Sequence, residues 1–296
     1  MPNFVYMSIP RNHHYVSQCH IKYFRNKEDE FYYCYNKETD KYYRKPSEKS
    51  IFSEDEANTR FHKGEIDHSS LEVDLQLNFE NDFIKHANNI FDFIATENKD
   101  GKAIVSSLYY IIRYGLIADA RSPHHKKTMD DGVNSLLKET ARKIKILGDE
   151  TQANSILQQI EDTKTKYSNL LKYTDIANSR LTRMGSLRFT IANIKTSDKF
   201  ILPDTGCYLK RARINNYINP NIREIALVGV PLTDKIFIYG ESTKVTSTSN
   251  DTLLINNTPS ELVDSINKNL FYFAINTVIT SDNTSLKSIV GKLKVE

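Results

Sequence analysis

Apolar residues recur at helical spacing through the middle of the chain. Residues 71–94 have an apolar residue every three or four positions, which predicts a long amphipathic helix that Ser69 or Ser70 can cap. Gly101 separates this helix from a second one over residues 102–120. Two further periodic runs, residues 133–147 and 153–171, are broken at Gly148. They predict two antiparallel helices of ~20 residues each, a hairpin that opens at Ser122-Pro123.

Short apolar and aromatic runs predict strands near the N-terminus. Residues 4–9 suit a strand, and residues 18–24 suit one short helix with Ser17 as its N-cap. Aromatic runs at residues 30–36 and 41–44 flank a polar turn and predict a β-hairpin. Residues 45–69 are polar and irregular and predict a long loop.

From residue 185 the pattern changes to short strands separated by turn residues. Strands are predicted at residues 186–194, 199–202, 225–230, 235–239 and 252–255, and a final helix begins near Thr258-Pro259. The pattern predicts an α+β fold. We expect an N-terminal unit over 1–121, a protruding helical hairpin over 122–183 and a C-terminal α+β region over 184–296. The two flanking parts are expected to pack together as one domain.

Composition limits the class of protein. The 296 residues are 39% hydrophobic, enough for a core, and the net charge of +3 is too small for a protein that coats DNA, although a local basic groove remains open. Three cysteines are widely spaced, which argues against a disulfide framework and favours a reducing compartment. No signal-like segment and no apolar run of ~20 residues is present, so we expect a soluble cytoplasmic protein without a membrane anchor.

All eight histidines fall within the first 125 residues, and two of them, His13 and His14, stand just ahead of the predicted short helix. A helix N-terminus favours anions and lowers the pKa of a nearby imidazole, so a neutral histidine there suits phosphate chemistry. A hydrogen-bonded structural corner is the alternative interpretation. Tyr15 and Gln18 follow in the same stretch and are candidates for contacts with nucleic acid.

Two acidic residues and one arginine on the long helices are further candidates. Glu72 and Glu80 lie beside the apolar seam, ~12 Å apart along the helix axis, so they cannot easily share a metal ion. If one is functional, Glu80 is the better candidate, because it lies nearer the seam. Arg113 is the one basic residue between Ala103 and Ala120. A salt bridge to Glu80 and a phosphate-binding role compete evenly for it.

Basic residues concentrate in two later places. Lys210, Arg211 and Arg213 lie between Tyr208 and Tyr217, and basic and aromatic side chains together suit single-stranded nucleic acid. The cluster at residues 124–127 is interpreted as a solvated face, with contact to a phosphate backbone as the alternative. A mixed metal site using His14, Cys19 and Cys34 is conceivable, but buried cysteine is the commoner case. No Walker loop, GxGxxG, HExxH or GxSxG motif is present.

The histidine block resembles the hallmark of the bacterial domain-of-unknown-function family four-two-three-eight. That family carries a His-His-Tyr-Val-Pro-Gln-aromatic-Tyr-Leu-basic-x-Phe segment near its N-terminus, and this chain matches it at His13, His14, Tyr15, Val16, Gln18 and Phe24. Ser17 replaces the family proline, and either residue can start a helix. Later segments resemble the same family in the same order, namely Leu71-Glu72, Phe79-Glu80, residues 109–113 and residues 200–204. Of the polar core of the last motif, Asp204 alone is kept.

The resemblance implies an architecture and candidate residues, but no reaction. Together with the residues themselves, it suggests a composite site in which His13 and His14 lie within ~10 Å of Arg113 and Asp204. In an enzyme, His14 is the acid or base, His13 its partner or a metal ligand, Arg113 the phosphate clamp and Asp204 the orienter or metal ligand. Glu80 completes the candidate site.

Three functions follow from this site. The first is a nuclease or other phosphodiesterase, by analogy a toxin-type or phage-defence effector, with a divalent metal left open as cofactor. The second is a non-catalytic module that binds nucleic acid or protein, and the third is a scaffold in which the histidine block is a structural corner. An exposed apolar stripe on the helical hairpin would indicate a homodimer.

Overall fold

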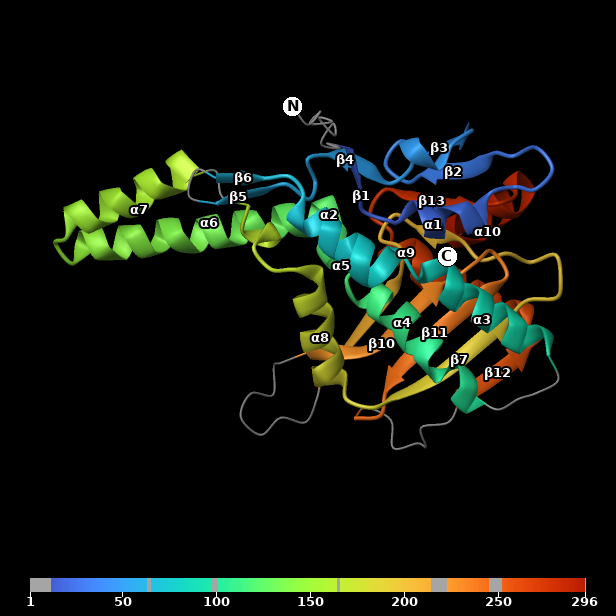
Figure 1. Ribbon diagram of the computed structural model, residues 1–296. Coiled ribbons are helices and arrows are strands. Elements are labelled where there is room, and N and C mark those ends of the chain that lie inside the picture. Colours follow the sequence, from blue (N-terminus) through green and yellow to red (C-terminus); the bar gives the residue numbers. More distant parts are fainter. Residues whose placement is uncertain are drawn as a thin grey trace, which may run out of the picture.

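The computed structural model describes residues 12–62, 65–96, 101–163, 166–213, 223–244 and 252–295. Helices and strands are mixed along the chain, which confirms the predicted α+β class (Figure 1). The strand expected at residues 4–9 lies outside the described residues. No described helix combines the length and the apolar character needed to cross a bilayer.

A five-stranded sheet forms the centre of the molecule. Its order is β12 (Thr252–Asn256), β7 (Leu187–Asn193), β11 (Ile236–Ser242), β10 (Arg223–Pro231) and β9 (Tyr208–Arg213). The pairing of β12 with β7 is parallel and the other three pairings are antiparallel. Four of these strands match predicted runs. The strand β9 was not predicted, because its basic residues had been interpreted only as a charged patch.

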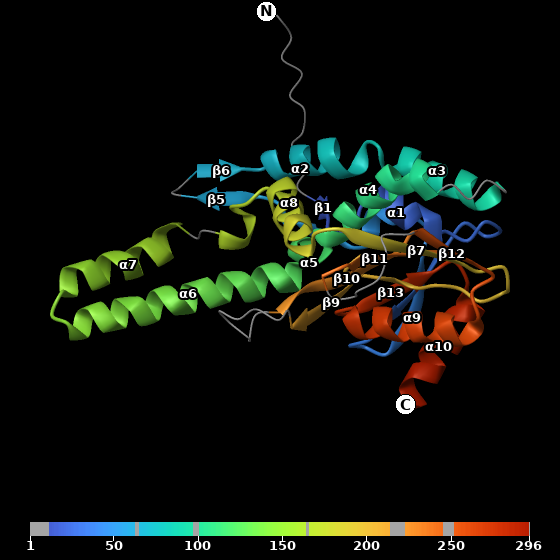
Figure 2. The ribbon, with the colours of Figure 1, turned by 90° about the horizontal axis from the view of Figure 1, so that it is seen from below.

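Helices cover both faces of this sheet (Figure 2). The helices α3 (Phe83–Ala95), α4 (Val105–Leu116) and α8 (Tyr173–Met184) share a core with one face. A Cβ at Gly115 would lie 2.7 Å from the side chains of Val228 and Val230, so glycine lets α4 approach β10 this closely. The helices α9 (Ser260–Phe273) and α10 (Asn283–Val295) lie on the other side, so two helices close the C-terminal region where one was expected.

The two ends of the chain share a second sheet. Its order is β3 (Lys41–Lys45), β2 (Tyr32–Asn36), β13 (Thr277–Thr280) and β8 (Leu202–Pro203). The β2–β3 pair confirms the predicted hairpin, and β2 pairs with β13 from near the C-terminus. This pairing brings the N-terminal segment onto the C-terminal region.

The segment that carries the histidine block contains more regular structure than predicted. The strand β1 (Asn12–His14) pairs with β4 (Ser53–Asp55), and β5 (Arg60–His62) pairs with β6 (Glu65–Asp67). The turn η2 (Glu48–Ser50) precedes β4, so the expected long loop is wrong. The predicted short helix is confirmed as α1 (Gln18–Ile21), which continues into η1 (Lys22–Phe24).

The two long predicted helices are interrupted. The first consists of α2 (Ser70–Leu75), a five-residue π-helical segment η3 (Gln76–Glu80) and α3. The second begins with η4 (Gly101–Ile104) and ends with α4 and α5 (Ala118–Arg121). Apolar spacing does not reveal a π-helical segment, since one extra residue in a turn leaves most of the buried face intact.

A helical hairpin, α6 (Pro123–Ile146) and α7 (Glu150–Thr163), projects from the body of the molecule at the left of Figure 1. Gly148 adopts φ 94° at its tip, so the predicted break is confirmed. The second helix ends at Thr163, short of the expected residue 171. The turn η5 (Tyr167–Asn169) leads to α8, which packs on α4 and β10, so this last part of residues 122–183 does not protrude.

Candidate functional site

A buried arginine, Arg121 at the end of α5, lies at the centre of a polar network. Its side chain is 2% exposed. The guanidinium donates to Ser17 Oγ at 2.9 Å and to the backbone carbonyl of His14 at 2.7 Å, and it pairs with Glu80 Oε1 at 3.4 Å. Arginine stays charged, so burying it requires such partners. Arg121 therefore fixes the histidine segment against the π-helical segment.

Glu80 is the last residue of η3, and its carboxylate is 31% exposed. Ser17 donates its hydroxyl to the same oxygen that Arg121 contacts. The expected capping role of Ser17 is wrong in this respect: Ser17 occupies the N-cap position of α1, but its hydroxyl does not bond a helix amide. π-helical segments are frequent at functional sites, and this one orients a partly exposed carboxylate.

His13 is held rigidly within this network. It lies in β1, is buried, and its Nδ1 accepts the backbone N–H of Asn58 at 2.9 Å. An imidazole nitrogen that accepts a hydrogen bond carries no proton, so this contact selects one tautomer of His13. The contact ties β1 to the segment after β4.

Asn58 extends the network to the base of the helical hairpin. Its amide group donates to Glu72, and its carbonyl oxygen accepts from Tyr173 Oη and Lys126 Nζ, both at 2.7 Å. Lys126 also donates to the carbonyl of Ala57 at 2.6 Å. Burial, together with the nearby cations Arg121 and Lys166, lowers the pKa of Lys126 to about 7. The solvated face expected at residues 124–127 is therefore wrong for Lys126, which is buried.

His14 is held more loosely than His13. It is half-buried, its Nε2 contacts the carbonyl of Glu48 at 3.3 Å, and its Nδ1 contacts the Gln18 amide nitrogen at 3.3 Å. Both contacts are longer than ordinary hydrogen bonds of this kind. Burial lowers the pKa of His14, so the imidazole is neutral at pH 7. His14 is thus a neutral imidazole that can exchange its contacts.

His20, by contrast, is fully enclosed. Its Nε2 donates to the carbonyl of Pro231 at 2.6 Å, and its Nδ1 accepts from the hydroxyl of Tyr114 at 3.2 Å. That hydroxyl in turn accepts the backbone N–H of Ser17. Burial lowers the pKa of His20 to about 4, so this histidine is a neutral structural link.

Asp204 lies in a different environment. Its carboxylate accepts the backbone N–H groups of Ile275, Asn276 and Thr277 at 2.7–2.9 Å, just where β13 begins. Burial raises the pKa of Asp204 although these three bonds favour its charged form. The structure thus engages both oxygens of Asp204 in holding the backbone. Burial, together with the nearby charge of Asp204, raises the pKa of the Tyr15 phenol, so Asp204 still lies near the histidine block.

Arg113 also has other partners. Its guanidinium lies 5.5 Å from the ring centre of Phe79 and donates to Asn178 of α8 at 3.2 Å. The sequence left open an ion pair between Arg113 and Glu80. In the structure Arg121 forms the ion pair with Glu80 instead. The structure thus joins His13, His14 and Glu80 in one network, and gives Arg113 and Asp204 contacts elsewhere.

The predicted nucleic-acid contacts are spread over two surfaces. Gln18 and Tyr15 lie beside His14, whereas Lys210 and Arg211 lie exposed on the edge strand β9. Arg211 contacts Asp119 at 3.5 Å. The side chain of Arg213 is outside the part of the chain that the structure describes.

Within the described residues, no group of three His, Cys, Asp or Glu side chains could hold a metal ion. The conceivable site of His14, Cys19 and Cys34 is therefore not formed there. Cys34 and Cys207 are buried free thiols, as the commoner case predicts.

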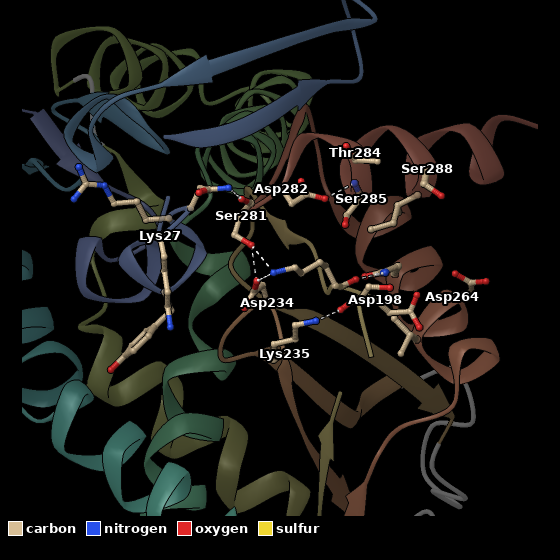
Figure 3. Close-up of a pocket in the computed structure, with 18 of the residues that line it drawn as sticks. Lys27, Asp198, Asp234, Lys235, Asp264, Ser281, Asp282, Thr284, Ser285 and Ser288 are labelled. Carbon is tan, nitrogen blue, oxygen red and sulfur yellow. Dashed lines mark hydrogen bonds and ion pairs between the residues drawn. The ribbon is translucent and has the colours of Figure 1, made fainter. Parts of the chain in front are cut away.

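A separate polar pocket of about 770 Å³ lies between the turn after η1, residues 197–199, the turn before β11 and the helices α9 and α10 (Figure 3). Lys199 Nζ donates to Asp234 at 2.6 Å and to Ser281 at 3.1 Å. Lys235 donates to two backbone carbonyls. The charged side chains in its wall are five cations and five carboxylates, Arg25, Lys27, Lys199, Lys235 and Lys292 with Glu28, Asp198, Asp234, Asp264 and Asp282.

The fold and the network define an α+β protein in which a buried arginine holds the segment that carries a pair of adjacent histidines. The family model described as "Protein of unknown function (DUF4238)" matches residues 12–284, so the chain belongs to this family and the resemblance is confirmed. No curated protein and no solved structure matches the chain.

Arg121, Lys126, Asn58 and Tyr173 are the network residues that sequence reasoning missed. Arg121 directly follows the apolar run of residues 103–120, in which Arg113 is the one basic residue. Ser122-Pro123, the predicted helix start, comes immediately after Arg121. This position, at the end of an apolar run and directly before a helix start, is the sequence signal that Arg121 offers. Asn58 and Tyr173 gave no comparable signal in the sequence.

Proposed function

We propose that the protein is a phosphodiesterase that cleaves nucleic acid, with His14 as the general base. One observation carries this proposal: His14 is a neutral, half-buried imidazole with exchangeable contacts, attached to a rigid network around Arg121. A general base must be unprotonated at the working pH and accessible to its substrate. His20 is neutral as well, but its bond to the carbonyl of Pro231 holds it in the protein interior, and the bond from Asn58 does the same for His13.

In the proposed step, a water molecule displaces the Gln18 amide from His14 Nδ1. The imidazole takes one proton from this water as its oxygen forms a bond to phosphorus. The bond from phosphorus to the leaving oxygen breaks with its electron pair, and solvent supplies the proton that this oxygen takes up. His14 then returns its extra proton to solvent. One water is consumed for each phosphodiester cleaved, and no electrons are transferred.

Charged residues around His14 support this assignment. Lys22 contacts Glu48 at 3.7 Å and is exposed, and the carbonyl of Glu48 accepts from His14, so Lys22 is the nearby cation suited to a substrate phosphate. Arg121 acts as a positioning residue, because Ser17, His14 and Glu80 already engage both of its terminal nitrogens.

The test is the variant His14→Ala, assayed on fluorescent single-stranded RNA and DNA. A catalytic imidazole contributes ~10²- to 10⁴-fold in rate, so cleavage falls at least ~100-fold while the melting temperature is kept. The matched control is His86→Ala, since His86 is also half-buried but lies on α3 and contacts Ser107. Equal cleavage by His14→Ala and wild type overturns the proposal.

The proposed setting is a bacterial cytoplasm, where such a nuclease would serve host or phage defence. Free cysteines suit a reducing compartment, and the defence role rests on analogy with toxin-type nucleases. Expression of the wild type then slows growth, and His14→Ala relieves this effect. Growth that is the same with both chains contradicts the toxin role.

A homodimer through the helical hairpin is part of the proposal. Large apolar side chains are exposed on this hairpin, among them Leu136 at 66%, Ile146 at 71% and Leu147 at 85%. Exposed apolar groups of this kind favour association. Leu136→Glu then lowers the sedimentation coefficient from that of a dimer to that of a monomer. A wild type that already sediments as a monomer contradicts the dimer.

The second candidate is a non-catalytic binding module, which the polar pocket of Figure 3 favours. Its charges balance, and several hydroxyl groups line it, so it suits a ligand that carries both charges or many polar groups. Titration with free amino acids and with inorganic phosphate, read by calorimetry, tests this function. The binding module is supported if the wild type binds one of these ligands, Lys235→Met does not bind it, and the wild type does not cleave nucleic acid.

A further inference from the structure

A small aromatic cavity of about 360 Å³ lies beside the histidine block. Its wall comes from β3, from the segment between η2 and β4, and from Tyr15 and Thr277, and consists of Tyr15, Tyr43, Lys45, Ser50, Ile51, Phe52, Ser53 and Thr277. It has no residue in common with the polar pocket of Figure 3.

The wall combines flat apolar surfaces with a single charge. The rings of Tyr15 and Phe52 lie 6.0 Å apart at 40°, and Tyr43 adds a third ring that is 38% exposed. Lys45 is the one charged residue in the wall, and it is half-buried. Aromatic rings with a nearby cation are suited to a planar ring that carries an anionic group.

Two contacts place this cavity next to His14. Ser53 in the cavity wall is the cross-strand partner of His14 in the β1–β4 pair, so their side chains lie on the same face. The backbone N–H of Tyr15 donates to the carbonyl of Phe52 at 2.9 Å, which joins the two segments directly after that pair.

The backbone at the cavity is strained. Phe52 adopts φ 53°, a left-handed conformation that a bulky residue rarely takes. Such conformations occur preferentially where a ligand is held, since the surrounding contacts must keep the chain in place. Here the carbonyl bond to Tyr15 and the burial of the Phe52 ring hold the strained residue.

We infer that this cavity binds one unpaired nucleobase of a single-stranded substrate, with Lys45 contacting the phosphate of that nucleotide. The inference rests on the proposed function, because it places the nucleobase of the substrate beside His14, the proposed general base. Aromatic side chains stack on bases of any sequence, so the cavity selects single strands and not a particular sequence. A base paired in a duplex has no free face to offer to Tyr43 and Tyr15.

The test measures binding of adenosine 5′-monophosphate by calorimetry, without any cleavage assay. Ribose 5-phosphate, which lacks the base, is the reference ligand. We expect the nucleotide to bind at least tenfold more tightly than ribose 5-phosphate. Equal affinity of the two overturns the inference, since it leaves no role for the aromatic wall.

Matched variants locate the binding site. Tyr43→Ala weakens nucleotide binding about tenfold, within the range for loss of one base–aromatic stack, and Tyr43→Phe keeps the ring and the affinity. The control is Tyr42→Ala, because Tyr42 is also 38% exposed and adjacent in β3, but it packs on Tyr35 and does not line the cavity. Affinity that is the same in Tyr43→Ala and Tyr42→Ala contradicts the inference.

Lys45→Met provides a second, independent variant that leaves the aromatic wall intact. It weakens both the nucleotide and ribose 5-phosphate, because each carries the phosphate. Failure of this inference and failure of the proposed function are distinguishable. If the wild type cleaves nucleic acid but binds the nucleotide independently of Tyr43, only the inference about the cavity is refuted. If the nucleotide binds through Tyr43 but nothing is cleaved, only the catalytic role is refuted.

Discussion

The network around Arg121 and the polar pocket of Figure 3 both gather charged side chains, but in different environments. In the network, Arg121 is 2% exposed, and burial also lowers the pKa values of His14 and Lys126. In the pocket, the side chains of the Lys199–Asp234 pair are 22% and 16% exposed. Near-complete burial therefore makes Arg121 depend on its partners in the network, whereas the more exposed side chains of the pocket offer polar contacts to a ligand.

The largest expected effect comes from breaking the network at its centre. Arg121→Met leaves the Glu80 carboxylate, the Ser17 hydroxyl and the His14 carbonyl without their shared donor. Removing one member of a buried ion pair costs about 3–5 kcal/mol, so the free energy of unfolding in urea falls by that amount. Arg113→Met is the control, because Arg113 is half-buried and contacts the Phe79 ring and the neutral side chain of Asn178. A loss below about 1 kcal/mol for Arg121→Met would show that the network contributes little.

The second effect concerns the pH dependence of stability. Lys126 has a pKa of about 7 in the folded protein and an ordinary value near 10.4 when unfolded. Between these values the unfolded chain binds one more proton than the folded chain, so the stability conferred through Lys126 rises with pH across that window. Below pH 7 both states are protonated and this dependence ends.

Lys126→Met removes this titration. The difference in unfolding free energy between wild type and variant should therefore change by roughly 2–4 kcal/mol from pH 7 to pH 10. Urea unfolding at several pH values measures it. A difference that stays constant over this range would mean that Lys126 keeps its ordinary pKa.

The smallest effect is expected in the pocket. Asp234→Asn removes a carboxylate that pairs with Lys199 and accepts from Ser281, both at a partly solvated surface. Such pairs contribute about 1 kcal/mol or less, so the melting temperature changes by only a few degrees. A loss as large as that of Arg121→Met would remove the contrast between the two regions.

Sequence patterns predicted the elements whose burial is periodic. The hairpin of β2 and β3, the strands β7, β10 and β11 and the break at Gly148 all follow from local spacing and turn residues. The π-helical segment that ends at Glu80 and the pairing of β2 with β13 did not follow, because each depends on contacts with distant parts of the chain.

The site was predicted in part for the same reason. The sequence offers a histidine pair just before a predicted helix and an acidic residue beside an apolar seam. The structure joins these residues, His13, His14 and Glu80, in one network. An ion pair between Arg113 and Glu80 is one of the two roles that the sequence leaves open for Arg113, whereas Arg121, eight residues further along, forms that pair. Spacing along a helix cannot decide this, since the choice depends on how α5 turns back toward Ser17.

The central claim is that His14 acts as a neutral general base, and the pH profile of cleavage tests it most directly. Since burial lowers the pKa of His14 below its ordinary 6.5, kcat/KM on a single-stranded oligonucleotide should rise with pH, reach half its plateau below pH 6.5 and stay level at pH 7. His14→Ala should lose both the rate and this rise. A half-point above pH 6.5, or the same profile in His14→Ala, would contradict the account.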